Sequence, residues 1–231
     1  MKKERRYHHG SLKKTLLDAT VKLIAKVGPR AFTLREVARL AKVSHNAPYR
    51  HFRDKEELLA AVAAEGFERL ADSMIETAAP AGDALEALLL AGRGYVQFAL
   101  QWPEHFSVMF DHCQNLDAYP DHAASAQRAF QVLLDHVARA QRSGQLPAGD
   151  ANPLAITCWS MVHGIAKLAI SGLLPFESRD AILDFTAQAA RTLAAGMQPP
   201  KNKAAPFKNK ASMPAGSRAR SAGKTPGSRH N

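Results

Sequence analysis

From residue 12 onward, the apolar positions of the chain recur at the spacing of amphipathic helices. Between residues 12 and 27 they return every three or four positions with lysines between them, and Gly28 followed by proline ends the pattern. A second, shorter helix is predicted after Thr33, because Glu36 three residues later completes a capping box. Asp54 is the expected N-cap of a long third helix.

The segment VSHNAPYRHF, residues 43–52, lies between the second and third of these helices and contains a proline. Ser44 is the expected N-cap of a further short helix, and short helices joined this closely are typical of helix-turn-helix units. In such a unit the second helix of the pair enters the major groove of DNA. Pro48 would be the fourth residue of that helix, where it removes one backbone hydrogen bond unless the helix starts later. The helix is still predicted, but the direction of its first three side chains stays open.

After Pro80 the sequence predicts five further helical segments, at about residues 83–101, 103–110, 121–142, 151–174 and 178–196. The expected fold class is therefore all-α. Three parts are predicted along the chain: a helix-turn-helix head at 1–55, a helical body at 56–197 and a basic tail at 198–231. The tail has too few large apolar residues to bury a core and is expected to be disordered.

The charge is divided unevenly among these parts. Residues 1–55 hold 15 Lys and Arg against 4 Asp and Glu, residues 56–197 hold 8 against 17, and the tail holds 8 against none. A basic stretch alone is as often an ordinary solvated surface. A basic head beside an acidic body favours a polyanion as the partner of the head.

Several classes of protein lack support in the sequence. Two cysteines are too few for a disulfide framework, and no apolar leader follows the charged first residues. No uncharged apolar run reaches about 18 residues, so a cytoplasmic protein without a membrane span is expected. The histidines and cysteines show no compact ligand pair, so no metal or cofactor is expected. Without a catalytic motif such as G-x-S-x-G or H-E-x-x-H, the chain is not expected to be an enzyme.

The run TLREVARLAKVS at residues 33–44, followed by YRHF at 49–52 and DKEELL at 54–59, resembles the N-terminal DNA-binding domain of the tetracycline-repressor (TetR) family of transcriptional regulators. The resemblance covers about residues 11–60. It implies a three-helix DNA-binding domain followed by a helical domain for ligand binding and dimerisation, in which the last two helices form the homodimer. Pro48 departs from the pattern, because the family usually has an aliphatic residue there.

The candidate DNA-binding residues all lie in the head; they are Thr33, Ser44, His45, Asn46, Ala47, Tyr49, Arg50 and Lys55. As helix caps, Thr33 and Ser44 would leave backbone N–H groups for phosphates, although capping alone would also explain them. Asn46 suits adenine and Ala47 suits a thymine methyl group. By resemblance Tyr49 would contact the DNA backbone; a purely structural tyrosine is the alternative.

Seven residues of the body are candidates for lining an effector pocket: Phe98, Trp102, Phe106, Met109, Phe110, Trp159 and His163. The predicted function is a homodimeric repressor that binds a palindromic operator in double-stranded DNA and is released by a small-molecule effector of unknown identity. The alternative is a nonspecific nucleoid-type DNA-binding protein. The basic tail favours this alternative, because its positive charges would attract DNA of any sequence.

Overall fold

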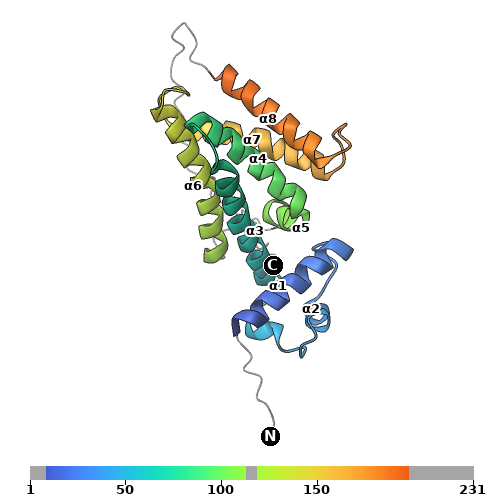
Figure 1. The fold of residues 1–231 in the computed structure, drawn as a ribbon. Helices are drawn as coiled ribbons and strands as arrows, with labels where there is room; N and C mark the ends of the chain where they lie inside the picture. Colours follow the sequence, from blue (N-terminus) through green and yellow to red (C-terminus); the bar gives the residue numbers. More distant parts are fainter. Residues whose placement is uncertain (1–8, 113–118, 198–231) are drawn as a thin grey trace, which may run out of the picture.

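The computed structural model describes residues 9–112 and 119–197; for residues 9–11 it describes the backbone alone. Within these ranges all regular secondary structure is helical and no strand occurs, which confirms the all-α prediction. Figure 1 shows the order of the elements. They are α1 (His9–Val27), α2 (Leu34–Leu40), the 3-10 helix η1 (Pro48–Arg50), α3 (Lys55–Ala78), α4 (Ala84–Gln101), α5 (Pro103–Ser107), the π-helical turn η2 (Val108–His112), α6 (Pro120–Arg142), α7 (Ala151–Ile170) and α8 (Arg179–Gly196).

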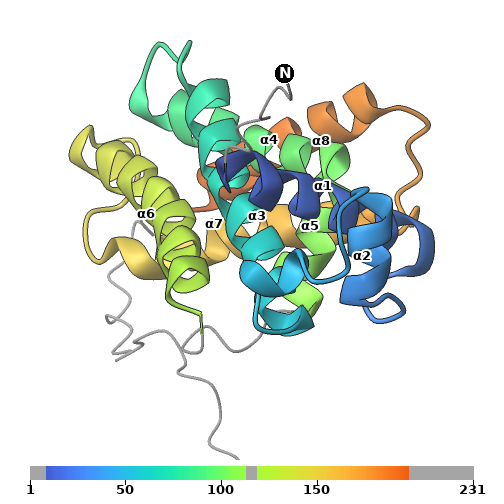
Figure 2. The same ribbon diagram turned by 90° about the horizontal axis from the view of Figure 1, so that it is seen from below.

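The head consists of α1, α2 and η1, and it packs around the first turns of α3 at one end of the molecule (Figures 1 and 2). From there α3 runs into the body and packs along α4 and α6. One continuous cluster of buried side chains includes Leu16 of the head and Phe98 of the body. The boundary expected between residues 55 and 56 falls at the start of α3, the helix that the two parts share.

Helices α3 and α4 approach closely at Gly94. A Cβ atom at this position would lie 2.6 Å from the carbonyl oxygen of Ser73 on α3, so only glycine fits without moving the backbone. The Ser73 hydroxyl donates a hydrogen bond of 2.9 Å to the Gly94 carbonyl at the same crossing. The crossing therefore holds α3, the helix shared by head and body, against α4 in the body.

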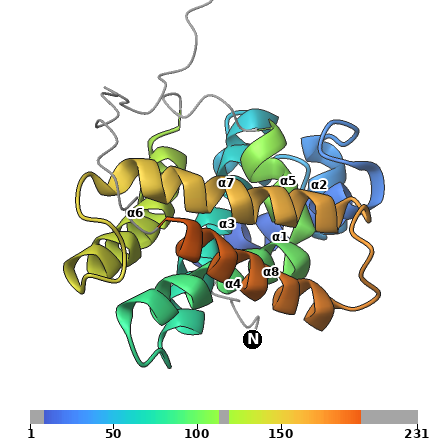
Figure 3. The ribbon, with the colours of Figure 1, turned by 90° about the horizontal axis from the view of Figure 1, so that it is seen from above.

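Helices α7 and α8 lie together at the end of the molecule opposite the head (Figure 3). In the described residues, α7 is the helix that is long and apolar enough to cross a membrane by length and composition alone, a test that core helices of soluble proteins also pass. Only 22% of its most apolar window is buried within the chain. An apolar helix with so little of its surface covered leaves a face available for a partner.

The segment predicted as one helix at 103–110 is α5 followed by the π-helical turn η2, which ends at His112. The helix boundaries depart from the sequence prediction at three further points. Helix α1 begins at His9, before the expected start at residue 12. Helix α7 ends at Ile170 and not near residue 174, because Gly172 adopts a left-handed φ of 67°. The third departure is the recognition segment, where no α-helix starts at Ser44. The predicted basic tail, residues 198–231, lies outside the described residues.

Candidate DNA interface and effector cavity

Helix α2 begins with the predicted capping box. The Thr33 hydroxyl accepts a hydrogen bond of 3.3 Å from the Glu36 N–H, and the Glu36 carboxylate accepts one of 2.8 Å from the Thr33 N–H. Hydrogen bonds from Thr33 hold the pKa of Glu36 below its usual value. The Glu36 carboxylate also accepts a hydrogen bond of 2.9 Å from the Thr33 hydroxyl. The Thr33 hydroxyl therefore both donates and accepts within the cap. The predicted phosphate contact was with backbone N–H groups, and at Thr33 and Glu36 these already donate within the capping box, so a phosphate there would have to displace those bonds.

The end of α2 turns the chain through a left-handed residue, Lys42, with φ of 56°. The Val43 N–H donates to the Ala38 carbonyl at 3.0 Å, and the Lys42 N–H donates to the Arg39 carbonyl at 3.2 Å. These two bonds make a Schellman motif, in which glycine is the usual residue at the position that Lys42 occupies. The turn directs the chain toward η1.

The recognition segment is a series of tight turns. The Ala47 N–H donates to the Ser44 carbonyl at 2.9 Å, and η1 follows with Ala47 as its N-cap and Pro48 at its first position. The prediction that Ser44 caps an α-helix is therefore wrong, and so is the placement of residues 45–47 in its first turn. Proline favours this outcome, because it lacks an N–H and restricts the residue before it, yet suits the first position of a helix.

The predicted DNA contacts differ in how accessible they are. Tyr49 is 52% exposed on η1, and Arg50, His45, Asn46 and Ser44 are also exposed. Ala47 is only 6% exposed, so its methyl group packs inward and does not fit the predicted thymine contact in this conformation.

Lys55 has partners within the head. Its Nζ donates a hydrogen bond of 2.8 Å to the Arg30 carbonyl and lies 4.5 Å from the centre of the Phe32 ring. Lys55 thus ties the start of α3 to the loop between α1 and α2. A phosphate contact by the same ammonium group would have to compete with both interactions.

Head and body are joined by a partly buried carboxylate, Glu65 on α3. It accepts hydrogen bonds of 2.9 Å from Lys14 Nζ of the head and of 2.9 Å from Arg69 Nε. Burial acts to raise the pKa of Glu65, but these hydrogen bonds outweigh it and lower the pKa. The Arg69 guanidinium also lies over the Trp102 ring, 4.3 Å from its centre. Sequence reasoning missed this connection because Lys14 and Glu65 are far apart along the chain.

Four of the seven predicted effector residues come together in one aromatic cluster. His163 lies with its ring centre 4.7 Å from Phe110, 5.3 Å from Phe106 and 6.1 Å from Trp159. Tyr95 completes the cluster: its hydroxyl is 2.9 Å from His163 Nδ1 and accepts a hydrogen bond of 3.2 Å from Trp159. Burial lowers the pKa of His163, which favours a neutral ring beside the tyrosine.

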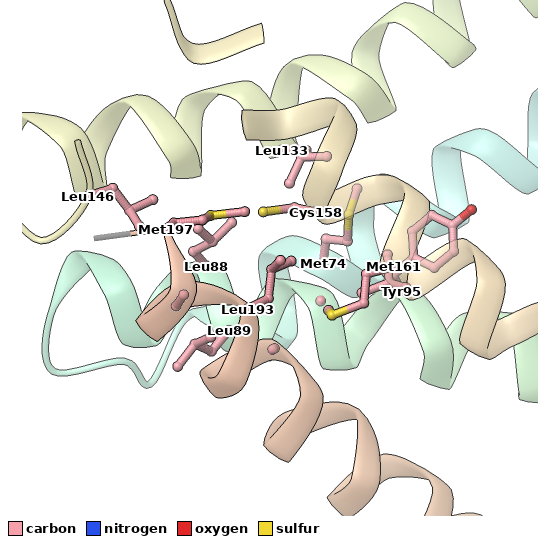
Figure 4. Close-up of a pocket in the computed structure, with 14 residues that line it drawn as sticks. Met74, Leu88, Leu89, Tyr95, Leu133, Leu146, Cys158, Met161, Leu193 and Met197 are labelled. Atoms are coloured by element: carbon pink, nitrogen blue, oxygen red, sulfur yellow. The ribbon is translucent and has the colours of Figure 1, made fainter. Parts of the chain in front are cut away.

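An apolar cavity lies next to this cluster, between α3, α4, α6, α7 and α8 (Figure 4). It is lined by Met74, Leu88, Leu89, Gly92, Tyr95, Leu133, Leu146, Cys158, Met161, Val162, Ala190, Leu193, Ala194 and Met197. None of the seven predicted effector residues belongs to this lining. The three predicted effector residues outside the aromatic cluster are Phe98, Trp102 and Met109, and they pack elsewhere in the core. No local signal in the sequence marks the cavity, because its lining comes from five helices.

The cavity measures about 40 Å³, far below the roughly 300 Å³ at which small-molecule sites begin. Its lining includes three methionines, whose unbranched side chains adapt readily to new shapes. Burial raises the pKa of the Cys158 thiol to about 11, so this cysteine stays neutral in the cavity wall. The cavity is thus suited to an uncharged, apolar group that displaces side chains as it enters.

Both parts of the chain match known families. Residues 16–62 match the model of bacterial regulatory proteins of the tetR family, and residues 88–193 match the model of the tetracyclin repressor-like C-terminal domain. The HTH-type transcriptional regulator BetI of Rhizobium meliloti is 30% identical over 165 residues, which cover 66% of this chain and 75% of BetI.

Solved structures have the same fold. A protein of unknown function from Rhodococcus sp. RHA1 matches with a TM-score of 0.74 and 31% identity, over 84% of this chain and 99% of that one. The transcriptional regulator FadR from Bacillus subtilis, solved in complex with stearoyl-CoA, matches with a TM-score of 0.68 over 80% of this chain and 99% of FadR. At 16% identity, the likeness to FadR concerns the fold alone.

Proposed function

This chain belongs to the TetR family of bacterial regulatory proteins, and we propose that it is a homodimeric repressor released from a palindromic operator by a small-molecule effector. As a member, it is a helix-turn-helix transcriptional regulator. We further propose that it acts in the cytoplasm and has no catalytic activity of its own.

The observation that carries the DNA-binding part of the proposal is the exposure of Tyr49 and Arg50 at the tip of a basic head. Tyr49 is 52% exposed although its ring is large and apolar, and an exposed aromatic side chain with a hydroxyl suits a phosphate backbone. His45 and Asn46, exposed on the preceding turn, are placed to reach base edges. Ser44, Thr33 and Lys55 would act as supports of this surface.

The uncovered side of α7 supports the homodimer. Ile156, Ser160, Gly164 and Leu168 follow one another at four-residue spacing, and Ile156 and Leu168 are each 43% exposed. A Cβ atom added at Gly164 would meet no atom of the chain. A second copy packing α7 and α8 against the same pair would cover this stripe and set two heads side by side, as a palindromic operator requires.

The apolar cavity supports release by an effector. Because Met74 belongs to α3, a compound entering between the methionines would push on the helix that carries the head. Tyr95 belongs both to the cavity lining and to the aromatic cluster. A displacement of Tyr95 would therefore also shift the predicted aromatic residues Phe106, Phe110, Trp159 and His163. An apolar compound would fit the lining best.

An electrophoretic mobility shift of the full chain tests the proposal. The probe is the DNA upstream of the chain's own coding region, challenged with the same duplex or with a scrambled duplex of equal composition. We expect the specific competitor to displace the probe at a much lower concentration. Equal competition by both duplexes would favour the alternative, a nonspecific nucleoid-type DNA-binding protein.

A further inference from the structure

A groove lies between the head and the first turn of α6, alongside the first half of α3. Its volume is about 300 Å³, which is within the range of small-molecule sites. The lining comes from α1, the segment after η1, the first half of α3 and the start of α6; it consists of Lys13, Leu17, His51, Phe52, Arg53, Glu57, Ala60, Ala61, Ala64, Tyr119, Pro120, Asp121 and His122. It shares no residue with the apolar cavity of the body.

His122 is the unusual member of this lining. Its side chain is 1% exposed, yet neither ring nitrogen has a hydrogen-bond partner among the described residues. Burial lowers its pKa, so near neutral pH the ring offers one N–H donor and one bare nitrogen acceptor. Buried polar groups in native proteins are rarely left without partners, and a bound ligand would supply one.

The start of α6 adds further donors. Its N-cap residue, Tyr119, makes no side-chain cap hydrogen bond, and Pro120 has no N–H to offer. Among the described residues, the backbone N–H groups of Asp121 and His122 therefore have no capping acceptor, and they lie at the positive end of a 23-residue helix. Uncapped N–H groups at such a helix end favour an anion.

The charges around the groove favour a single negative charge. Lys13 and Arg53 contribute two cations, and Glu57 and Asp121 contribute two carboxylates, with the rings of His51, Tyr119 and His122 between them. The Glu57 carboxylate already accepts a hydrogen bond of 2.6 Å from the Arg53 N–H. Because the two cations and the two carboxylates balance, the attraction left for an anion comes from the helix end, whose partial charge of about half an elementary charge suits a monoanion better than a dianion. Leu17, Phe52 and three alanines leave an apolar floor beside these groups.

We propose that this groove is a second ligand site, which binds a small organic monocarboxylate. The carboxylate lies at the start of α6 and accepts hydrogen bonds from the uncapped N–H groups and from His122. Its apolar chain lies over the alanines of α3, and Lys13 closes the site from the head. This site is separate from the effector cavity and does not depend on DNA binding.

Isothermal titration of the full chain with hexanoate at neutral pH tests the site. Hexan-1-ol and inorganic phosphate at the same ionic strength are the comparison ligands. We expect saturable binding of hexanoate, weaker by about tenfold in both Lys13→Gln and His122→Phe, since a hydrogen bond to a charged group is removed in each. Lys22→Gln, which removes an exposed lysine of the same helix outside the groove, should bind as the wild type does.

Each contrary result overturns the proposal. Absence of saturable hexanoate binding means that there is no site, and equal binding of hexan-1-ol means that the anion is not recognised. Phosphate binding as tightly as hexanoate shows that the apolar floor plays no part. Hexanoate affinity that is unchanged in Lys13→Gln places the ligand elsewhere; because Lys13 is exposed, this variant folds even if His122→Phe does not.

Discussion

Lys14 on α1 donates a hydrogen bond of 2.9 Å to Glu65 on α3, so the head is tied to the body by a charged pair 51 residues apart in the sequence. The Lys14 side chain is 48% exposed, whereas that of Glu65 is 18% exposed. Glu65 also accepts from Arg69, whose guanidinium lies over Trp102. The carboxylate thus connects three elements: α1, α3 and the start of α5.

Glu65→Gln should lower the free energy of unfolding by about 1–2 kcal/mol, because the lysine and the arginine lose a charged acceptor at a partly buried position. Denaturant unfolding followed by circular dichroism measures this change. Glu68→Gln on the same helix is the matched control: Glu68 pairs with Arg128 at the surface, its side chain is 46% exposed, and its loss should cost less than about 0.5 kcal/mol. Equal losses in the two variants would contradict a special role for Glu65.

His105 makes the stability depend on pH. Its side chain is 2% exposed and neither ring nitrogen has a hydrogen-bond partner among the described residues. Burial lowers its pKa to about 4, and this outweighs the opposing effect of Glu65, whose carboxylate lies 3.9 Å from His105 Nε2. The unfolded chain therefore binds a proton at His105 at a higher pH than the folded chain does.

Its contribution to stability is therefore complete above the unfolded pKa near 6.5 and is lost as the pH falls from there toward 4. Between pH 7 and pH 4.5 the loss from this group should be about 2 kcal/mol. In His105→Phe the difference in unfolding free energy between the two pH values should shrink by that amount. An unchanged difference would mean that His105 does not carry this pH dependence.

The sequence predicted the elements whose signals are local. Capping residues and amphipathic spacing placed α4 and α8 within one residue at each end. The local sequence pattern predicts an α-helix that starts at Ser44 and contains Pro48, whereas in the structure a tight turn and a 3-10 helix satisfy the same backbone groups.

Features that depend on distant segments could not be predicted in this way. The inward packing of Ala47, the contact between Lys14 and Glu65 and the lining of the apolar cavity all follow from how helices meet. The sequence predicted part of the aromatic cluster, namely Phe106, Phe110, Trp159 and His163, because these large residues recur at the spacing of a buried helix face. Tyr95, which joins the cluster to the cavity, was not identified as a site residue.

Lys42→Gly should stabilise the head by about 1 kcal/mol, because a residue with a Cβ atom is strained at a left-handed φ. Thermal unfolding of the full chain measures the effect. Lys42→Ala removes the same charge but keeps the Cβ atom, so it should leave the stability nearly unchanged. A similar gain in both variants would assign the effect to the charge and not to the backbone.

Tyr49→Phe should weaken binding to every DNA sequence by about tenfold, because it removes a hydroxyl that would bond to a phosphate. Asn46→Ala should instead change the preference among sequences, because the bidentate contact of an Asn with adenine is worth about 1–3 kcal/mol of discrimination. Fluorescence anisotropy at one fixed salt concentration, with an operator and its point variants, separates the two effects. Val27→Ala, at an exposed position at the end of α1, is the control. Unaltered binding in both Tyr49→Phe and Asn46→Ala would contradict the assignment of the DNA-binding surface to η1 and the turn before it.

Gly164→Gln should leave the fold of the single chain intact and abolish the dimer. The position of its Cβ atom is open in the chain, so glutamine fits there and favours the helix. In the proposed dimer the same side chain would stand between the two copies of α7 and keep them from packing closely. Sedimentation velocity should show a monomer with the helical circular dichroism of the wild type, and the affinity for a palindromic duplex should fall. Ala124→Gln, exposed on α6, should remain dimeric, whereas a dimer of Gly164→Gln would place the interface on another face.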